Sequence, residues 1–350
     1  MKNVIVTGGG TGGHLFATLA FCDYLKKEQY NPIIIGSIHG LENEILKNKE
    51  YEYMLLDTMG FAGKTTKEKL RSILKFIKST YHIKQYIKLK NPKFVVGFGG
   101  YTTVPVIVAS KMLKIKTAIV EQNAIFGRAN KFLSRFADLV FTNFESTKNA
   151  IKHKKVFAVG CPVRSEIFIK NRDFSKNRIT IGVMGGSRGA RSINNAMIEL
   201  AHEEIDINVI HQTGKYDYEH VKSEYSKLKP NWTVFDFIYD MKNFYESIDF
   251  IVCRAGASTI SEITCAALGS LLIPYPYAIY NHQYYNALEL VNGGSATIIE
   301  DKNLSGKSLK SVILSLSKNR LRSLSDRAKL MCKRDVCSEM LKIIKTELTG

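Results

Sequence analysis

The chain has 350 residues, of which 45% are hydrophobic and 23% charged, and its formal net charge is +18. This length is typical of two domains, and this composition excludes a disordered chain. No apolar run approaches the roughly 18–20 residues that span a bilayer, and no basic-then-apolar leader opens the sequence. We therefore expect a protein that is neither exported nor integral to a membrane. Six scattered cysteines without a CxxC pair indicate reduced thiols and a cytoplasmic setting.

Short apolar strands alternate with helices through the first half of the chain. We expect strands at residues 3–7, 31–36, 94–97, 117–121, 139–142 and 156–159. Helices are expected near residues 14–28, 41–47, 67–90, 104–113 and 129–137. Such alternation is typical of a parallel sheet covered by helices on both faces.

The same pattern restarts in the second half. Strands are expected at residues 178–184, 207–212, 232–235, 250–253, 270–274 and 296–299. Helices are expected near 192–205, 218–228, 241–247, 258–268, 282–292, 306–316 and along 321–348. The sequence thus predicts an α/β protein of two Rossmann-like domains with parallel sheets facing across a cleft. We set them at residues 1–161, completed by the C-terminal helix 335–350, and at 162–334. Such sheets bind ligands at the carboxyl ends of their strands, so we expect the active site in the cleft between them.

Glycine-rich turns follow three of the predicted strands, at residues 8–13, 97–101 and 185–189. Glycine lets a backbone turn approach a ligand closely and leaves amides at a helix N-terminus, which suits an anion. The first turn matches the dinucleotide-binding pattern, but the second strand ends at Ser37 without the acid that would hold a ribose, which disfavours NAD or FAD. Any one turn could serve packing alone. Three of them predict an anionic ligand.

His14 follows the first glycine turn at the start of the predicted helix. A helix N-terminus disfavours the protonated imidazole, so a histidine there can accept a proton. The alternative is a histidine that only hydrogen-bonds to the backbone. The neighbouring turns favour His14 as a general base.

The most specific stretch runs from Cys253 to Glu262. A strand ends at Cys253, the turn carries Gly256, and the hydroxyls of Ser258 and Thr259 open a helix. Free amides at this position suit a diphosphate, and Glu262, one turn later, is spaced to accept hydrogen bonds from vicinal ribose hydroxyls. The alternative is an ordinary capped helix with a glutamate favoured by the helix dipole.

The sequence holds no Asp-x-Asp motif and no His/Cys cluster with metal-ligand spacing. We therefore expect no bound metal and no other cofactor in the donor site. The diphosphate would be stabilised by amides and side chains, with Arg164 and Arg254 as candidate helpers.

Residues 64–93 carry ten basic side chains against the single acid Glu68, with apolar residues at helical spacing between them. Some of the apolar residues are expected to face a core. The functional alternative is a helix that lies on an anionic membrane surface. Nucleic acid is not expected as a partner, because no recognised binding motif occurs.

The order of these motifs resembles the MurG family over nearly the whole chain, on residues 9–14, 97–101, 121–123, 160–164, 185–190, 253–262 and 282–287. This resemblance implies a GT-B glycosyltransferase that works on the cytoplasmic face of the cell membrane as a peripheral protein. It implies transfer of N-acetylglucosamine from UDP-N-acetylglucosamine to the 4-hydroxyl of the muramoyl sugar of undecaprenyl-diphosphate-linked MurNAc-pentapeptide. The basic segment 64–93 would stand where the family has its membrane-association patch.

The resemblance also implies a set of donor-binding residues: Thr11, Gly12, Gly13, Asn123, Arg164, Ser187, Ile238, Ala257, Ser258, Thr259, Glu262 and Gln283. Within this set, Asn123 and Gln283 would hold the sugar, and the backbone of Ile238 would meet uracil. A loop for the acceptor and diphosphate is implied at Gly99, Gly100 and Tyr101.

Two positions depart from the family's pattern. Val120 stands where a histidine usually precedes Glu-Gln-Asn, so the role of general base falls on His14. Arg188 replaces a common glutamine, which leaves the donor contact at that position open. We expect an inverting single displacement in which His14 takes the proton of the acceptor hydroxyl.

Three alternatives remain at this point. A hydrolysing UDP-N-acetylglucosamine 2-epimerase shares the GT-B architecture but would leave the basic segment without a use. A nucleotide-sugar-binding protein without catalysis would not need His14. A nucleic-acid binder rests on net charge alone.

Overall fold

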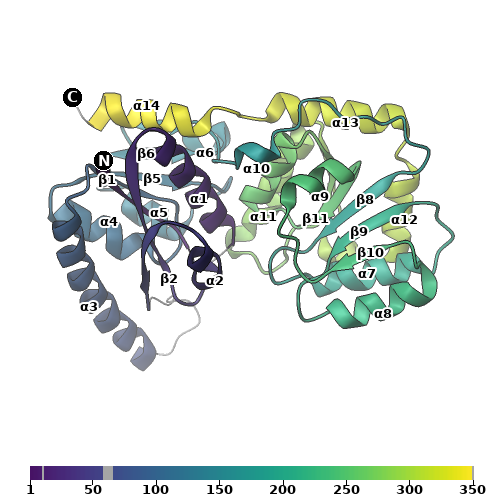
Figure 1. Cartoon of the computed structure of the whole chain (residues 1–350), viewed down its shortest axis with the longest axis horizontal. Helices are drawn as coiled ribbons and strands as arrows, with labels where there is room; N and C mark the ends of the chain where they lie inside the picture. The colour runs from purple at the N-terminus through teal and green to yellow at the C-terminus, as the bar shows by residue number, and fades with distance from the viewer. Residues whose placement is uncertain (10–11, 58–65, 349–350) are drawn as a thin grey trace. The chain divides into compact units, whose positions relative to one another are not determined.

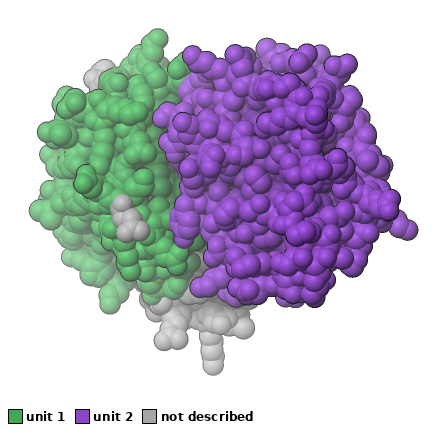
Figure 2. All heavy atoms as spheres, turned by 45° about the vertical axis from the view of Figure 1, so that its right-hand side comes forward, with its two compact units in different colours: residues 1–163, 335–350 green, residues 164–334 purple. Residues whose placement is uncertain are grey.

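The structure, a computed structural model, describes residues 1–9, 12–57 and 66–348, and of residues 48 and 66–77 the backbone alone. The chain divides into two compact units (Figures 1 and 2). Unit 1 comprises Met1–Val163 with Asp335–Gly350, and unit 2 comprises Arg164–Arg334.

Unit 1 is built on a seven-stranded parallel sheet with the order β3-β2-β1-β4-β5-β6-β7. Its strands are β1 (Lys2–Thr7), β2 (Tyr30–Ser37), β3 (Glu52–Leu56), β4 (Phe94–Gly97), β5 (Lys116–Glu121), β6 (Leu139–Thr142) and β7 (Val156–Ala158). Its helices are α1 (Gly12–Lys27), α2 (Glu42–Ile45), α3 (Thr66–Lys90), α4 (Thr103–Met112), α5 (Arg128–Leu133), α6 (Glu145–Asn149) and α14 (Val336–Leu348).

Both faces of this sheet are buried. Val4 and Val6 of β1 pack in one core with side chains of α1 and α14, while Ile5 packs in a second core with Ile83 of α3 and Val106 of α4. Successive residues of a strand point to opposite faces, so a strand covered on both sides must be apolar throughout. This explains why these strands could be recognised as continuous apolar runs.

Unit 2 is built on a six-stranded parallel sheet with the order β10-β9-β8-β11-β12-β13. Its strands are β8 (Thr180–Met184), β9 (Asn208–Gln212), β10 (Thr233–Phe235), β11 (Phe250–Cys253), β12 (Gly269–Leu272) and β13 (Ala296–Ile298). Its helices are α7 (Arg191–Ala201), α8 (Tyr218–Leu228), α9 (Met241–Ser247), α10 (Ala257–Cys265), α11 (His282–Asn292), α12 (Gly306–Leu314) and α13 (Lys318–Met331). The predicted α/β class with two parallel sheets is thereby confirmed.

Three details of the prediction were wrong, and one of them is the short helix α6, which was not predicted. Strand β3 was not predicted, because it lies at the sheet edge and its first residues, Glu52 and Tyr53, are exposed, so the segment lacks an apolar run. The single helical stretch expected at 321–348 is two helices, α13 and α14, separated by residues 332–335. At this break the chain leaves unit 2 and returns to unit 1 (Figure 1).

Two glycines of the turn between β8 and α7 provide a matched test of the close packing there. Both have left-handed backbones, with φ of +91° at Gly186 and +77° at Gly189. A Cβ on Gly189 would lie 2.0 Å from the carbonyl oxygen of Thr213, whereas no described atom lies within 4 Å of a Cβ on Gly186. A left-handed φ costs other residues about 1–2 kcal/mol. We expect Gly186→Ala to lose about that much stability and Gly189→Ala to lose clearly more.

Trp232 is the single tryptophan of the sequence and is buried in unit 2. Urea unfolding followed by its fluorescence therefore reports on the unit that contains both glycines. Equal losses for the two variants would contradict the packing described here.

Candidate functional site

In unit 1, the turns after β1 and β4 are in main-chain contact. The two strands are neighbours and end in register, with Thr7 opposite Gly97. A Cβ on Gly8 would lie 2.8 Å from the Cβ of Phe98, and a Cβ on Gly100 would lie 2.2 Å from the carbonyl oxygen of Gly9. Only glycine allows this approach. The first two glycine turns predicted from the sequence thus form one surface at the carboxyl edge of the sheet.

His14 lies on this surface, in the first turn of α1. A Cβ on Gly99 would lie 3.1 Å from its Nε2 atom, so the imidazole packs over the second glycine turn. Tyr101, at the end of that turn, is 48% exposed. Val120, which occupies the position of the family histidine, is fully buried in the core. The structure therefore brings His14 together with Gly99 and Gly100.

Gly12 and Gly13 are the first two residues of α1, where backbone amides have no partner within the helix. Thr11 and the stretch 58–65, which includes Lys64, lie outside the described residues. The side chains of residues 66–77, which belong to the basic segment, also lie outside the described part of the chain.

Glu42 is a buried carboxylate that was not predicted from the sequence. It is 0% exposed, and a Cβ on Gly9 would lie 1.9 Å from its Oε1 atom and one on Gly36 3.0 Å from its Cγ atom. A ribose-binding acid would be expected at the end of the second strand, whereas Glu42 is the first residue of α2. Because it is enclosed by glycines, it supports the first glycine turn and does not present itself to a ligand.

Glu121 anchors the segment that carries Asn123. Its Oε1 atom accepts hydrogen bonds from the backbone and side-chain amides of Asn123 at 3.0 and 3.2 Å. Its Oε2 atom accepts from the amide of Gly127 and from Nδ2 of Asn130, both at 2.9 Å. Burial raises the pKa of Glu121, and these four hydrogen bonds oppose the rise. The motif was noted in the sequence, but the anchoring role of its glutamate was not.

In unit 2, Gln212 links the third glycine turn to the segment of Ile238. Its side chain is buried, its Nε2 atom donates to the carbonyl of Gly186 at 3.1 Å, and its Oε1 atom accepts from the amide of Ile238 at 2.9 Å. Ser187 is half-buried in this turn and Arg188 is exposed. One amide side chain therefore fixes two predicted donor-binding segments relative to each other.

The amino end of α10 combines free amides with a buried carboxylate. The helix begins at Ala257, so the amides of Ala257, Ser258 and Thr259 have no partner within it. Glu262, one turn later, is buried; its Oε1 atom accepts from Nη2 of Arg164 at 3.2 Å and its Oε2 atom from the hydroxyl of Tyr245 at 3.0 Å. Burial raises the pKa of Glu262, and the positive charge of Arg164 opposes the rise. Tyr245 was not predicted as a site residue, because its partner Glu262 lies 17 positions away along the chain.

Arg254 has a different role from the one expected. Its guanidinium forms an ion pair with Asp301 and donates to Ser192 at 2.8 Å and to the carbonyls of Ile273 and Pro274 at 3.2 and 3.3 Å. These partners lie on segments after three strands of unit 2, β8, β12 and β13, while Arg254 itself follows β11. Arg254 therefore holds these segments together, and we do not assign it to the diphosphate.

Gln283 is the second residue of α11, and its Oε1 atom accepts from the amide of Tyr275 at 2.9 Å. Asn286, one turn on, is buried and donates to the carbonyl of Ala255 at 3.1 Å. This hydrogen bond joins α11 to the turn before α10. Gln283 and the amino end of α10 are thus held on the same edge of unit 2.

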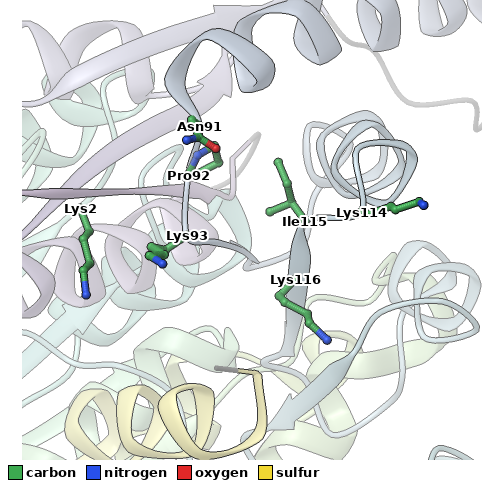
Figure 3. A pocket seen from close by; sticks show the side chains of 7 residues that line it. All are labelled: Lys2, Asn91, Pro92, Lys93, Lys114, Ile115 and Lys116. Carbon is green, nitrogen blue, oxygen red and sulfur yellow. The ribbon is translucent and has the colours of Figure 1, made fainter. Parts of the chain in front are cut away.

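A pocket of about 430 Å³ lies at the opposite, amino edge of the sheet of unit 1. It is lined by Lys2, Asn91, Pro92, Lys93, Lys114, Ile115 and Lys116. The four lysine side chains point in different directions (Figure 3). They therefore form a basic surface and do not converge on one small anion.

Among the described residues, no group of three or more His, Cys, Asp and Glu side chains is placed to hold a metal ion. Within the same residues, no helix has the length and apolar character that crossing a membrane requires.

Comparison with known proteins relates both units to glycosyltransferases. Residues 4–142 match the glycosyltransferase family 28 N-terminal domain and residues 180–340 match the C-terminal domain of the same family. A UDP-N-acetylglucosamine–N-acetylmuramyl-(pentapeptide) pyrophosphoryl-undecaprenol N-acetylglucosamine transferase from Thermodesulfovibrio yellowstonii is 40% identical over 319 residues, which is 87% of either chain.

Solved structures agree with this relation. MurG of Acinetobacter baumannii superimposes with a TM-score of 0.81 at 28% identity, covering 99% of this chain and 100% of the other. A UDP-N-acetylglucosamine 2-epimerase superimposes with a TM-score of 0.70 at 13% identity, covering 100% and 98%, a likeness that concerns the fold alone. The chain therefore belongs to glycosyltransferase family 28, within the MurG family of N-acetylglucosamine transferases that the order of its motifs resembles.

Proposed function

We propose that this enzyme transfers N-acetylglucosamine, with inversion, from UDP-N-acetylglucosamine to the 4-hydroxyl of MurNAc-pentapeptide on undecaprenyl diphosphate. The names of its relatives supply the donor, the transferred sugar and the acceptor lipid, while the inversion and the 4-hydroxyl are part of the proposal. The observation that carries the proposal is the amino end of α10, where free amides stand one turn from the buried carboxylate of Glu262. Amides at a helix N-terminus suit a diphosphate, and a carboxylate suits the hydroxyls of a ribose.

The donor would be bound mainly by unit 2. In this proposal the amides of Ala257, Ser258 and Thr259 meet the diphosphate, and they, rather than a bound cation, stabilise the charge of the leaving UDP. The amide of Ile238 is already engaged by Gln212, so we assign the carbonyl of Ile238 to the N3–H group of uracil. Further donor contacts are proposed at Thr11, Gly12, Gly13, Asn123, Arg164, Ser187 and Gln283.

The acceptor would be activated in unit 1. The imidazole of His14 packs over Gly99. We assign to His14 the proton of the acceptor hydroxyl, and to the glycine turn at Gly99, Gly100 and Tyr101 the acceptor side of the site. Such a base typically contributes 10²–10⁴-fold to the rate, an order-of-magnitude range.

The direct test is incubation of the enzyme with labelled UDP-N-acetylglucosamine and a panel of lipid-diphosphate sugars. The proposal expects a disaccharide-lipid product with the muramoyl acceptor. Release of UDP and the C2-epimerised sugar, without lipid product, would replace it with the epimerase alternative.

His14→Ala is expected to lower kcat by about 10²–10⁴-fold while the affinity for UDP-N-acetylglucosamine stays within a factor of about two, because only the proton acceptor is removed. His153, a half-buried histidine beside the amino end of β7, offers a matched control. His153→Ala should leave kcat unchanged. If His14→Ala weakened donor binding as much as turnover, His14 would be a binding residue and not the base.

We propose that the protein docks on the membrane through the end of α3 and the basic surface beside it. Leu89 and Tyr81 on α3 are 77% and 61% exposed, and Met112 at the end of α4 is 57% exposed. Lys93 and Lys114 line the adjacent pocket. Exposed apolar side chains beside lysines suit the headgroup region of an anionic bilayer. We therefore propose a peripheral protein of the cytoplasmic membrane face.

Leu89→Glu is expected to reduce the fraction of enzyme that sediments with phosphatidylglycerol vesicles, because it places a negative charge on the docking face. Leu330→Glu is the matched control, since Leu330 is 80% exposed on α13 of unit 2. If the sedimenting fraction fell equally in both variants, or fell in neither, α3 would be removed from the proposed docking face.

A further inference from the structure

Each carboxylate oxygen of Glu262 has a different partner. Oε1 accepts from Nη2 of Arg164 at 3.2 Å, from a residue 98 positions away along the chain. Oε2 accepts from the hydroxyl of Tyr245 at 3.0 Å, 17 positions away on α9. Tyr245 is fully buried, and only 11% of the Glu262 side chain is exposed. The carboxylate is therefore held from two sides in one orientation.

This arrangement leaves room for two more donors. An ionised carboxylate has about four acceptor positions, two on each oxygen. Arg164 and Tyr245 take one position on different oxygens, so each oxygen keeps one. A pair of vicinal hydroxyls presents two donors side by side, which matches the two remaining positions.

We propose that Tyr245 is a positioning residue which orients the carboxylate of Glu262 toward both hydroxyls of a ribose, and that it thereby sets the preference for a ribonucleoside diphosphate over its 2′-deoxy counterpart. This inference rests on the proposed function, because the ribose is assigned to Glu262 there.

The hydroxyl of Tyr245 is suited to this role. A polar group in the interior is costly unless it is hydrogen-bonded, so the bond to Glu262 is maintained. Burial, together with the charge of Glu262, holds the pKa of Tyr245 well above its usual value. The phenol therefore stays protonated and remains a donor to the carboxylate at neutral pH.

Tyr245→Phe tests the inference with the smallest change, the loss of one hydroxyl. Titration calorimetry with UDP and with 2′-deoxy-UDP gives the two affinities. The wild-type enzyme should prefer UDP. In the variant, UDP affinity should fall by about 3–10-fold, less than a whole hydrogen bond to a charged group contributes, because the carboxylate loses its orientation but stays in place. The affinity for 2′-deoxy-UDP should change less, so the preference should shrink.

The pH dependence of UDP binding provides a readout that loosened packing alone would not move. Burial raises the pKa of Glu262 and the charge of Glu166 adds to this, while Arg164 and the hydroxyl of Tyr245 lower it. Since binding needs the ionised carboxylate, affinity falls as pH drops through this pKa. Removing the hydroxyl raises the pKa further, so the loss of affinity should begin at higher pH in Tyr245→Phe.

Tyr225→Phe is the matched control. Tyr225 is as buried as Tyr245 and lies in the same unit, but its hydroxyl contacts His211 at 2.9 Å and not Glu262. Both variants remove a buried hydroxyl, so they should lower stability comparably. Only Tyr245→Phe should change the UDP preference and the pH profile.

A second probe covers the case in which Tyr245→Phe does not fold. Site-specific 3-fluorotyrosine at position 245 keeps the ring and hydroxyl but makes the phenol a stronger donor. The acid limb of UDP binding should then shift to lower pH. The inference would be overturned if the fluorinated enzyme lost UDP affinity at the same pH as the wild type. It would also be overturned if Tyr245→Phe kept the full preference for UDP over 2′-deoxy-UDP. Absence of UDP binding by the wild-type enzyme would instead overturn the proposed function.

Discussion

A Cβ on Gly100 would lie 2.2 Å from the carbonyl oxygen of Gly9, and a Cβ on Gly189 would lie 2.0 Å from that of Thr213. In both units, main chain therefore packs directly against main chain at the carboxyl ends of adjacent strands. Parallel strands end at one edge, which brings their turns together. Any side chain at these glycines would separate the turns and displace the amides of the following helices. The proposed site thus depends first on steric contact between backbones, and only then on the side chains placed around it.

Three buried carboxylates support these edges, two of them in unit 1 and one in unit 2. Glu42 is enclosed beside the first glycine turn, Glu121 accepts four hydrogen bonds from the segment after β5, and Glu262 is held by Arg164 and Tyr245. A carboxylate removed from water is costly unless hydrogen bonds replace its hydration. Such a group tolerates few alternative arrangements of its donors, so these glutamates fix the loops as well as offering charge. This explains why acids occur at sheet edges that are proposed to bind an anion.

The sheets and the glycine turns could be predicted because their signals are local: strands buried on both faces are continuous apolar runs, and each turn follows its strand directly. What could not be predicted depends on partners distant in sequence. Gln212 forms hydrogen bonds with Gly186 and Ile238, each 26 positions away along the chain. Tyr245 donates a hydrogen bond to Glu262, which is 17 positions away. Arg254 was expected at the diphosphate, since charge and position alone gave no sign of its ion pair with Asp301. A side chain's type can be read from the sequence, but its partner is decided by the fold.

The arginines of unit 2 show why net charge says little about the site. Arg172 donates to the carbonyl of Ala266, which follows α10, at 2.7 Å. It also donates to the carbonyl of Ile248, which follows α9, at 2.6 Å and to that of Tyr245, within α9, at 2.5 Å. Burial lowers its pKa to about 10, so it remains charged at neutral pH. Helix ends leave carbonyls without partners, and one guanidinium here serves two helices. It thereby holds α9 against α10, the pair that carries Tyr245 and Glu262. Arg172 and Arg254 are thus both engaged inside the unit, which is consistent with the proposed assignment of the diphosphate to the amides of α10.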